Sequence, residues 1–279
     1  MKAALDCIHC FQRQALEAAR MASDDLWLHE KITREVMGKL LAMDWDKRPT
    51  EISGIVHGIV KEISGNADPY KRVKKEYNDI ALKMYLGLEK IVKNSQDPIQ
   101  TAVRLAIAGN VIDFAVSSEF DLDGAIDSAL ARKFAIDDMP ALKEELESGR
   151  EILYIADNAG EIVFDRLLLE TILSCYSPRK IKFVVKASPV VNDVTLDDAR
   201  YVGIDKIPNL EFIEVGPGLE RTSGKFKEIV ENNLTISKGQ GNYEALSEVE
   251  TIFFLFMVKC MVVARDLEVG MGGIVLKRG

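Results

Sequence analysis

The segment Glu151-Ile-Leu-Tyr-Ile-Ala-Asp-Asn-Ala-Gly-Glu161 decides the fold class, because a short apolar run ends abruptly in polar residues and glycine. Its first half predicts a buried strand, and residues 162–176 continue with apolar residues at helical spacing. Further strand-like runs occupy residues 181–185, 210–215, 234–237, 252–258 and 274–276, with helical patterns at 194–202 and 226–233. This alternation predicts a Rossmann-like, mostly parallel, three-layer α/β/α domain over residues 150–279.

The sequence before residue 150 has a different rhythm. Helical patterns follow one another at residues 5–21, 26–43, 52–63, 70–92 and 98–114, with two shorter ones at 122–133 and 140–148. No strand-like alternation separates them. We therefore expect a helical N-terminal region, residues 1–149, that packs on the α/β domain.

Composition narrows the function classes. The chain has 279 residues and a formal net charge of −8, whereas binding to a nucleic-acid backbone requires a surplus of Lys and Arg. Residues 252–258 form the most apolar stretch, far shorter than the roughly 20 residues that cross a bilayer. The chain has four cysteines and no predicted secretion signal, which favours a reducing compartment over a disulfide-bonded scaffold. We expect a cytoplasmic protein without nucleic-acid or membrane partners, whose oligomeric state the sequence does not indicate.

Polar side chains follow three of the predicted strands, where each strand ends. Asp157 and Asn158 follow the first, Asn192 and Asp193 come after the second, and Lys238 ends the fourth. Ligands of open α/β sheets bind beyond the carboxyl ends of the strands, so these groups are expected at one edge. The oxygen atoms of Asp157, Asn158 and Asp193 suit Mg²⁺ or Mn²⁺.

The neighbouring residues have compatible roles. Lys238 offers a positive charge for phosphate, and Gly239 allows close approach of the backbone to a ligand. A helix beginning near Asn242 would direct N–H groups at an anion. Glu161 could orient or deprotonate a water molecule. Each segment taken alone is also compatible with ordinary turn and helix-capping chemistry.

Taken together, these segments resemble the damage-control phosphatases, first described as domain of unknown function 89. The resemblance rests on Asp157-Asn-Ala-Gly-Glu161, Asn192-Asp-Val-Thr195, Lys238-Gly-Gln-Gly-Asn-Tyr-Glu244, Arg104-Leu-Ala-Ile-Ala-Gly-Asn-Val-Ile-Asp113 and Lys259-Cys-Met-Val-Val-Ala264. Cys7-Ile-His-Cys10 is similar to the opening of the microbial, CxxC-bearing branch. The likeness covers nearly the whole chain.

The resemblance implies a phosphatase of small phosphorylated metabolites, such as sugar phosphates or phosphopantetheine-like compounds. Its cofactor would be Mg²⁺, Mn²⁺, Co²⁺ or Ni²⁺, held by Asp157, Asn158 and Asp193 and activating a water molecule. Eukaryotic members have Asp-Leu where this chain has Gln240-Gly241, so their substrate preference does not transfer. The implied substrate and phosphate contacts are Asn110, Asp113, Asn192, Lys238, Gly239 and Asn242.

Several alternatives remain open at this stage. A methyltransferase dependent on S-adenosylmethionine usually has an acid at the end of its second strand, where this chain has Lys186-Ala-Ser188. Attack by Asp157 on phosphorus would usually be accompanied by a second acid, where this chain has Ala159. A metal- and phosphometabolite-binding protein without turnover uses the same ligand groups. Cys7 and Cys10 could be packing residues, half of a metal site or a redox pair.

Overall fold

A seven-stranded sheet forms the centre of the protein. The computed structural model describes residues 1–109, 126–127, 130–216 and 224–279. Within these, the sheet order is β1-β7-β6-β5-β2-β3-β4, and every neighbouring pair is parallel except β6 with β7. The predicted α/β class with a mostly parallel sheet is confirmed. The strands are β1 (Phe134–Asp137), β2 (Ile152–Ile155), β3 (Ile181–Lys186), β4 (Leu210–Val215), β5 (Leu234–Lys238), β6 (Ile252–Met257) and β7 (Ile274–Arg278).

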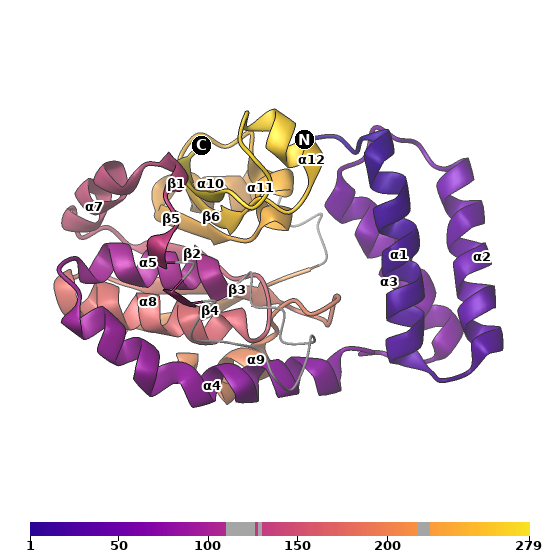
Figure 1. Ribbon diagram of the computed structural model, residues 1–279, viewed down its shortest axis with the longest axis horizontal. Helices are drawn as coiled ribbons and strands as arrows, with labels where there is room; N and C mark the ends of the chain where they lie inside the picture. Colours follow the sequence, from indigo (N-terminus) through magenta and orange to yellow (C-terminus); the bar gives the residue numbers. More distant parts are fainter. Residues whose placement is uncertain (110–125, 128–129, 217–223) are drawn as a thin grey trace.

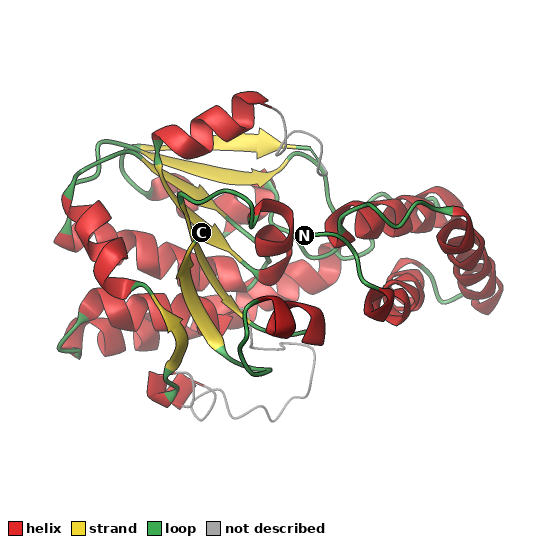
Figure 2. Cartoon of the chain, turned by 90° about the horizontal axis from the view of Figure 1, so that it is seen from above, coloured by secondary structure: helices red, strands yellow, loops and turns green. Residues whose placement is uncertain are grey.

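Helices cover both faces of the sheet (Figure 2). Ile152 and Tyr154 of β2 face one cluster of buried side chains, and Leu153 and Ile155 face the other, as the period of a strand requires. The first face is covered by α4 (Lys71–Asn94), α5 (Pro98–Gly109), α7 (Met139–Glu147), α8 (Glu161–Cys175) and α9 (Leu196–Tyr201). The second is covered by α10 (Gly224–Asn232), α11 (Gln240–Leu246) and α12 (Met261–Asp266).

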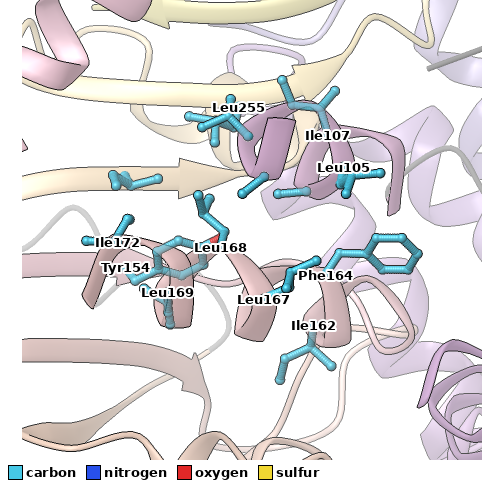
Figure 3. Close-up of a cluster of buried hydrophobic side chains, with 14 of the residues drawn as sticks. Leu105, Ile107, Tyr154, Ile162, Phe164, Leu167, Leu168, Leu169, Ile172 and Leu255 are labelled. Atoms are coloured by element: carbon cyan, nitrogen blue, oxygen red, sulfur yellow. The ribbon is translucent and has the colours of Figure 1, made fainter. Parts of the chain in front are cut away.

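The larger cluster of buried side chains shows how α5 and α8 pack on the first face of the sheet. Tyr154 and Leu255 from the sheet pack with Leu105 and Ile107 of α5, and α8 contributes a nearly continuous apolar run. Figure 3 shows side chains of this run, from Ile162 to Ile172, beside Leu105 and Ile107 of α5 and near Tyr154 and Leu255 of the sheet. Because α8 is buried over most of its circumference, it is covered by α5 as well as by the sheet.

A three-helix bundle stands beside the sheet (Figure 1). It consists of α1 (Ile8–Ala22), α2 (Leu26–Ala42) and α3 (Pro49–Ser64) and buries small clusters of its own around residues such as Phe11 and Ile32. Helix α3 starts with a proline in its first turn and ends at Gly65, whose φ of 69° suits glycine. Helix α4 follows and extends from the bundle to α8 (Figure 1).

The part of the chain expected to be helical throughout also contributes a strand. Phe134–Asp137 forms β1 at one edge of the sheet, paired with β7. Helices α4 and α5 pack on α8 and on each other. The expected helix at 122–133 lies largely outside the described residues. None of the described helices combines the length and apolar character needed to span a membrane.

Candidate active site

The loops after β2 and β3 are joined by their backbones. Val194 N donates to Asp157 O at 2.9 Å, and Ala159 N donates to Asn192 O at 2.9 Å. Between these two bonds, Asn158 and Asp193 form an isolated antiparallel bridge. The structure therefore brings together the three predicted metal ligands, Asp157, Asn158 and Asp193, because β2 and β3 are parallel neighbours.

Negative charge is concentrated at this junction. Asn158 Nδ2 donates to Asp157 Oδ2 at 2.6 Å and to Glu161 Oε2 at 3.3 Å. Burial and the carboxylates of Glu161 and Asp193 raise the pKa of Asp157 to about 8, against the opposite effect of Lys259 and Lys238. The ionised form of Asp157 is therefore disfavoured in these surroundings, and a cation bound beside it would stabilise that form.

Gly239 determines how closely β5 approaches Asp157. Its φ is +82°, and a Cβ atom built on it would lie 1.9 Å from Asp157 Oδ2. Its N–H donates to Leu255 O at 3.1 Å, which fixes the backbone between the ends of β5 and β6. Glycine is therefore required on two grounds, backbone conformation and space for the carboxylate.

The donor chemistry fits a hard divalent cation. Asp157 and Asp193 supply carboxylate oxygens, and the amide nitrogen of Asn158 is directed at carboxylates, which leaves its Oδ1 for another partner. No three His, Cys, Asp or Glu side chains among the described residues are arranged to hold a metal by themselves. Two acids and an amide suit an oxygen-rich site completed by water and substrate.

Lys238 lies inside the protein, away from the open edge. Its ammonium group is completely buried and donates to Ala106 O at 2.8 Å, Glu161 Oε1 at 2.6 Å and Asp165 Oδ1 at 2.5 Å. Burial alone would lower the pKa of Lys238, but the two carboxylates raise it to about 12. All three donors of the ammonium group are thus used by protein acceptors. In this arrangement a bound phosphate would find no donor on Lys238.

The other predicted contacts have mixed placements. Asn242 is buried and its Nδ2 donates to Lys238 O at 2.6 Å and Ala156 O at 3.1 Å, so it joins the ends of β5 and β2. Asn192 contributes its backbone carbonyl to the loop junction. Asn110 and Asp113 lie outside the described residues. The N-terminus of α11 is at Gln240, two residues before the expected start.

A cavity of about 610 Å³ opens at the edge of the sheet. Asp157 and Asp193 line it, together with Lys186, Lys259 and side chains of the bundle that include Cys7 and Cys10. Lys186 also lines an adjacent cavity of about 1220 Å³ between α4 and the ends of β3 and β4. The volume of the smaller cavity is in the range of sites for small metabolites.

Sequence reasoning missed the two lysines that line this cavity. Lys186 Nζ is 3.3 Å from Asp193 Oδ2, and Lys259 affects the titration of Asp157. A usable signal existed, because Lys186 ends a strand and Lys259 follows the strand 252–258, as the predicted ligands do. Asp165, which accepts a hydrogen bond from Lys238, and Asn78, described below, do not follow a predicted strand and had no comparable signal in the sequence.

Comparisons with known proteins cover the whole length of the chain. Residues 3–275 match the model of the damage-control phosphatase ARMT1-like domain. An uncharacterised protein of Methanocaldococcus jannaschii is 36% identical over 98% of this chain and 94% of its own length. Damage-control phosphatases of Pyrococcus horikoshii and Archaeoglobus fulgidus are 33% and 35% identical, over at least 98% of each chain. The crystal structure of a DUF89 family protein from Pyrococcus horikoshii, 32% identical, superposes with a TM-score of 0.88 and covers 100% of this chain and 99% of its own.

Proposed function

Because the chain belongs to the family of the damage-control phosphatase ARMT1-like domain, we propose that it is a divalent-metal-dependent phosphatase of small phosphorylated metabolites. The resemblance noted in the sequence is thereby confirmed at the level of the family. One observation carries the metal-dependent part of the proposal. The backbone bridge between Asn158 and Asp193 joins two loops whose oxygen-bearing side chains lie beside Asp157 at the mouth of a cavity.

Asp157, Asn158 and Asp193 are the proposed ligands of the cation. A cation bound there would draw charge from a phosphoryl oxygen and lower the pKa of a water molecule. Asn158 presents its Oδ1 because its Nδ2 is held by two carboxylates. Glu161 is one of these, and we assign it the role of orienting Asn158.

The phosphate group of the substrate needs positive partners within the cavity. Lys186 lies beside Asp193 and lines the cavity, and Lys259 lines it near Asp157, so we assign phosphate contact to these two residues. We give Lys238 a different task, namely neutralising Glu161 and Asp165 in the interior. This assignment moves the phosphate contact from the end of β5 to the end of β6, one strand away, and to the end of β3, two strands away on the other side.

The cavity suits a substrate such as a sugar phosphate or a phosphopantetheine-like compound. The adjacent larger cavity, which shares Lys186, could take the part of a longer substrate that carries no phosphate. An S-adenosylmethionine-dependent methyltransferase is less compatible with the site, because β3 ends in a lysine that approaches Asp193. Phosphate release distinguishes the enzyme from a protein that only binds metal and ligand.

The test is phosphate release by chelator-stripped protein with Mg²⁺, Mn²⁺, Co²⁺ or Ni²⁺ restored singly. Substrates would be p-nitrophenyl phosphate, a panel of sugar phosphates and phosphopantetheine. Asp157→Asn and Asp193→Asn keep the size of the side chain and remove its charge. Asp205→Asn, on an exposed acid of the same type, is the matched control.

The expected result is activity that returns with metal, disappears in Asp157→Asn and Asp193→Asn, and persists in Asp205→Asn. Equal activity with and without metal would overturn the metal-dependent mechanism. Absence of turnover together with metal binding would favour the non-catalytic alternative. Trapping of a phosphorylated Asp157 would favour covalent attack instead.

A further inference from the structure

Asn78 of helix α4 contacts the loop after β2, which carries the proposed metal ligands Asp157 and Asn158. Asn78 lies on α4 and is 1% exposed. Its Oδ1 accepts a hydrogen bond of 2.7 Å from Gly160 N, a contact between residues 82 positions apart in the sequence. Asn78 is not among the predicted ligands or substrate contacts, and in a helix of many charged residues nothing in the sequence distinguishes it.

The hydrogen bond from Gly160 N to Asn78 is a third bond that holds the backbone of the loop after β2. Asp157 O and Ala159 N are already tied to the loop after β3. Gly160 is the next residue, with φ 80° and ψ −57°, and it caps α8 without a side chain of its own. The N–H of Gly160 is buried, so without Asn78 this donor would have no acceptor. An unsatisfied buried donor is costly, and this cost would favour a change in the backbone conformation of the loop.

Helix α4 is itself held against the first turn of α9, which follows the loop after β3. Lys74, one helical turn before Asn78, is 2% exposed and donates to Asp198 Oδ2 at 2.8 Å. The same oxygen accepts from Thr195 N at 2.9 Å and from Thr195 Oγ1 at 2.6 Å. One face of α4 therefore contacts the loop after β2 through Asn78 and the N-terminus of α9 through Lys74, so a second buried contact helps to set the position of Asn78.

We propose that Asn78 is a positioning residue for the metal site. By holding Gly160 N–H, it keeps the peptide units of the Asp157–Gly160 loop in the orientation that directs Asp157 and Asn158 at the cation. The inference rests on the proposed function, because it assumes that this loop binds metal. Groups that hydrogen-bond metal ligands directly generally contribute about 10- to 100-fold to metal affinity. Asn78 acts on Asp157 and Asn158 through the Gly160 peptide, so about 100-fold is the upper end of the expected effect.

The test compares metal affinity in two variants of nearly equal size. Asn78→Leu removes the acceptor, and Asn78→Asp keeps an acceptor oxygen at the same place. Mn²⁺ would be titrated into chelator-stripped protein by isothermal titration calorimetry, with the melting temperature and the kcat and KM for p-nitrophenyl phosphate measured in parallel. Tyr85→Phe is the matched control, because it removes the bond of Tyr85 to Glu170 between the same two helices, α4 and α8.

The expected result is a Kd for Mn²⁺ raised about 10- to 100-fold in Asn78→Leu, with less than about a tenfold change in Asn78→Asp and none in Tyr85→Phe. A lower melting temperature with unchanged Kd in Asn78→Leu would reduce the residue to a structural role and overturn the inference. A raised KM with unchanged Kd would make it a substrate contact and also overturn it.

Failure of the underlying function gives a different result. Wild-type protein that binds none of Mn²⁺, Mg²⁺, Co²⁺ and Ni²⁺ in the same titration would overturn the proposed function, and the inference with it. Wild-type binding that Asn78→Leu leaves intact would overturn the inference alone. If Asn78→Leu does not fold, Asn78→Ala carries the same expectation, since it too lacks an acceptor for Gly160 N–H.

Discussion

Strands β3 and β5 both end in a lysine, yet the surroundings of the two lysines are opposite. Lys238, at the end of β5, is completely buried and donates to three acceptors within the protein. Lys186, at the end of β3, has a side chain that is 14% exposed and lines two cavities.

The difference comes from what covers each strand end. β5 lies between β2 and β6, and α5 and α8 close over its end, with Ala106 and Glu161 contacting the ammonium group. β3 ends toward the bundle, where Lys61 of α3 donates to Pro189 O in the loop that follows. A lysine at a strand end therefore serves the interior or the ligand according to which helices cover it.

Replacing Lys238 should have the largest effect. Lys238→Met leaves Glu161 and Asp165 buried without their cation, so the free energy of unfolding should fall by about 3–5 kcal/mol. Urea denaturation at pH 7 measures it. Lys182→Met, which breaks the more exposed pair with Glu151, is the control and should cost less than about 1 kcal/mol. Equal losses in both variants would contradict the contrast between interior and edge.

The neighbouring glycine tests the same strand end through geometry. Gly239→Ala introduces a Cβ atom where the Asp157 carboxylate lies, at a φ of +82°. Displacement of that carboxylate by about 1 Å should lower kcat/KM about 100-fold. Phosphate release under metal saturation measures it. Gly58→Ala, on an open helix surface with no atom within 4 Å, should retain full activity.

His57, which lies near the loop after β3, should make the free energy of unfolding depend on pH. This residue of α3 lies close to Pro189 and Val191, and burial lowers its pKa from 6.5 to about 4. Between these two values the unfolded chain binds more protons than the folded chain, so stability falls as the pH decreases. The loss between pH 7.5 and pH 5 should be about 2 kcal/mol. His57→Leu should remove that part of the pH dependence.

The measurement is the free energy of unfolding of wild type and His57→Leu at several pH values between 4 and 7.5. Other acids titrate in this range, so the difference between the two proteins is the relevant quantity. His9→Gln, which changes an exposed histidine of α1, is the control. If the two curves of wild type and His57→Leu run parallel, His57 is not buried in its neutral form.

The smallest effect is expected at Lys186. Lys186→Met removes one positive partner of the proposed phosphate site, so kcat/KM should fall about tenfold, while the free energy of unfolding changes by less than about 1 kcal/mol. Kinetics and urea denaturation on the same preparation check both parts. A loss of stability close to that of Lys238→Met would show that the two strand ends do not differ.

Much of the fold could be predicted from the sequence, because buried strands and helices leave distinct periodicities. Strand β1 was the exception. Its four residues alternate between half-buried and exposed and follow a helical stretch, so no apolar run marks them. The convergence of Asp157, Asn158 and Asp193 could be predicted because parallel strands end at one edge.

The environment of Lys238 could not be predicted in the same way. Asp165 lies on α8, one turn after Glu161, and reads as an ordinary polar residue of an apolar helix. Only the packing of α8 against β5 brings its carboxylate to the ammonium group. Asn78 is a comparable case, because its role depends on where α4 crosses the loop. Contacts between elements distant in sequence left no local signal.

The bridge between Asn158 and Asp193 also has an evolutionary consequence. Because the two loops are paired residue against residue, a one-residue insertion in either would shift the pairing and turn a ligand side chain away from its partner. Both loops should therefore tolerate substitutions more readily than changes in length. Relatives of different length are expected to carry their insertions and deletions elsewhere, and engineered segments are best introduced elsewhere too.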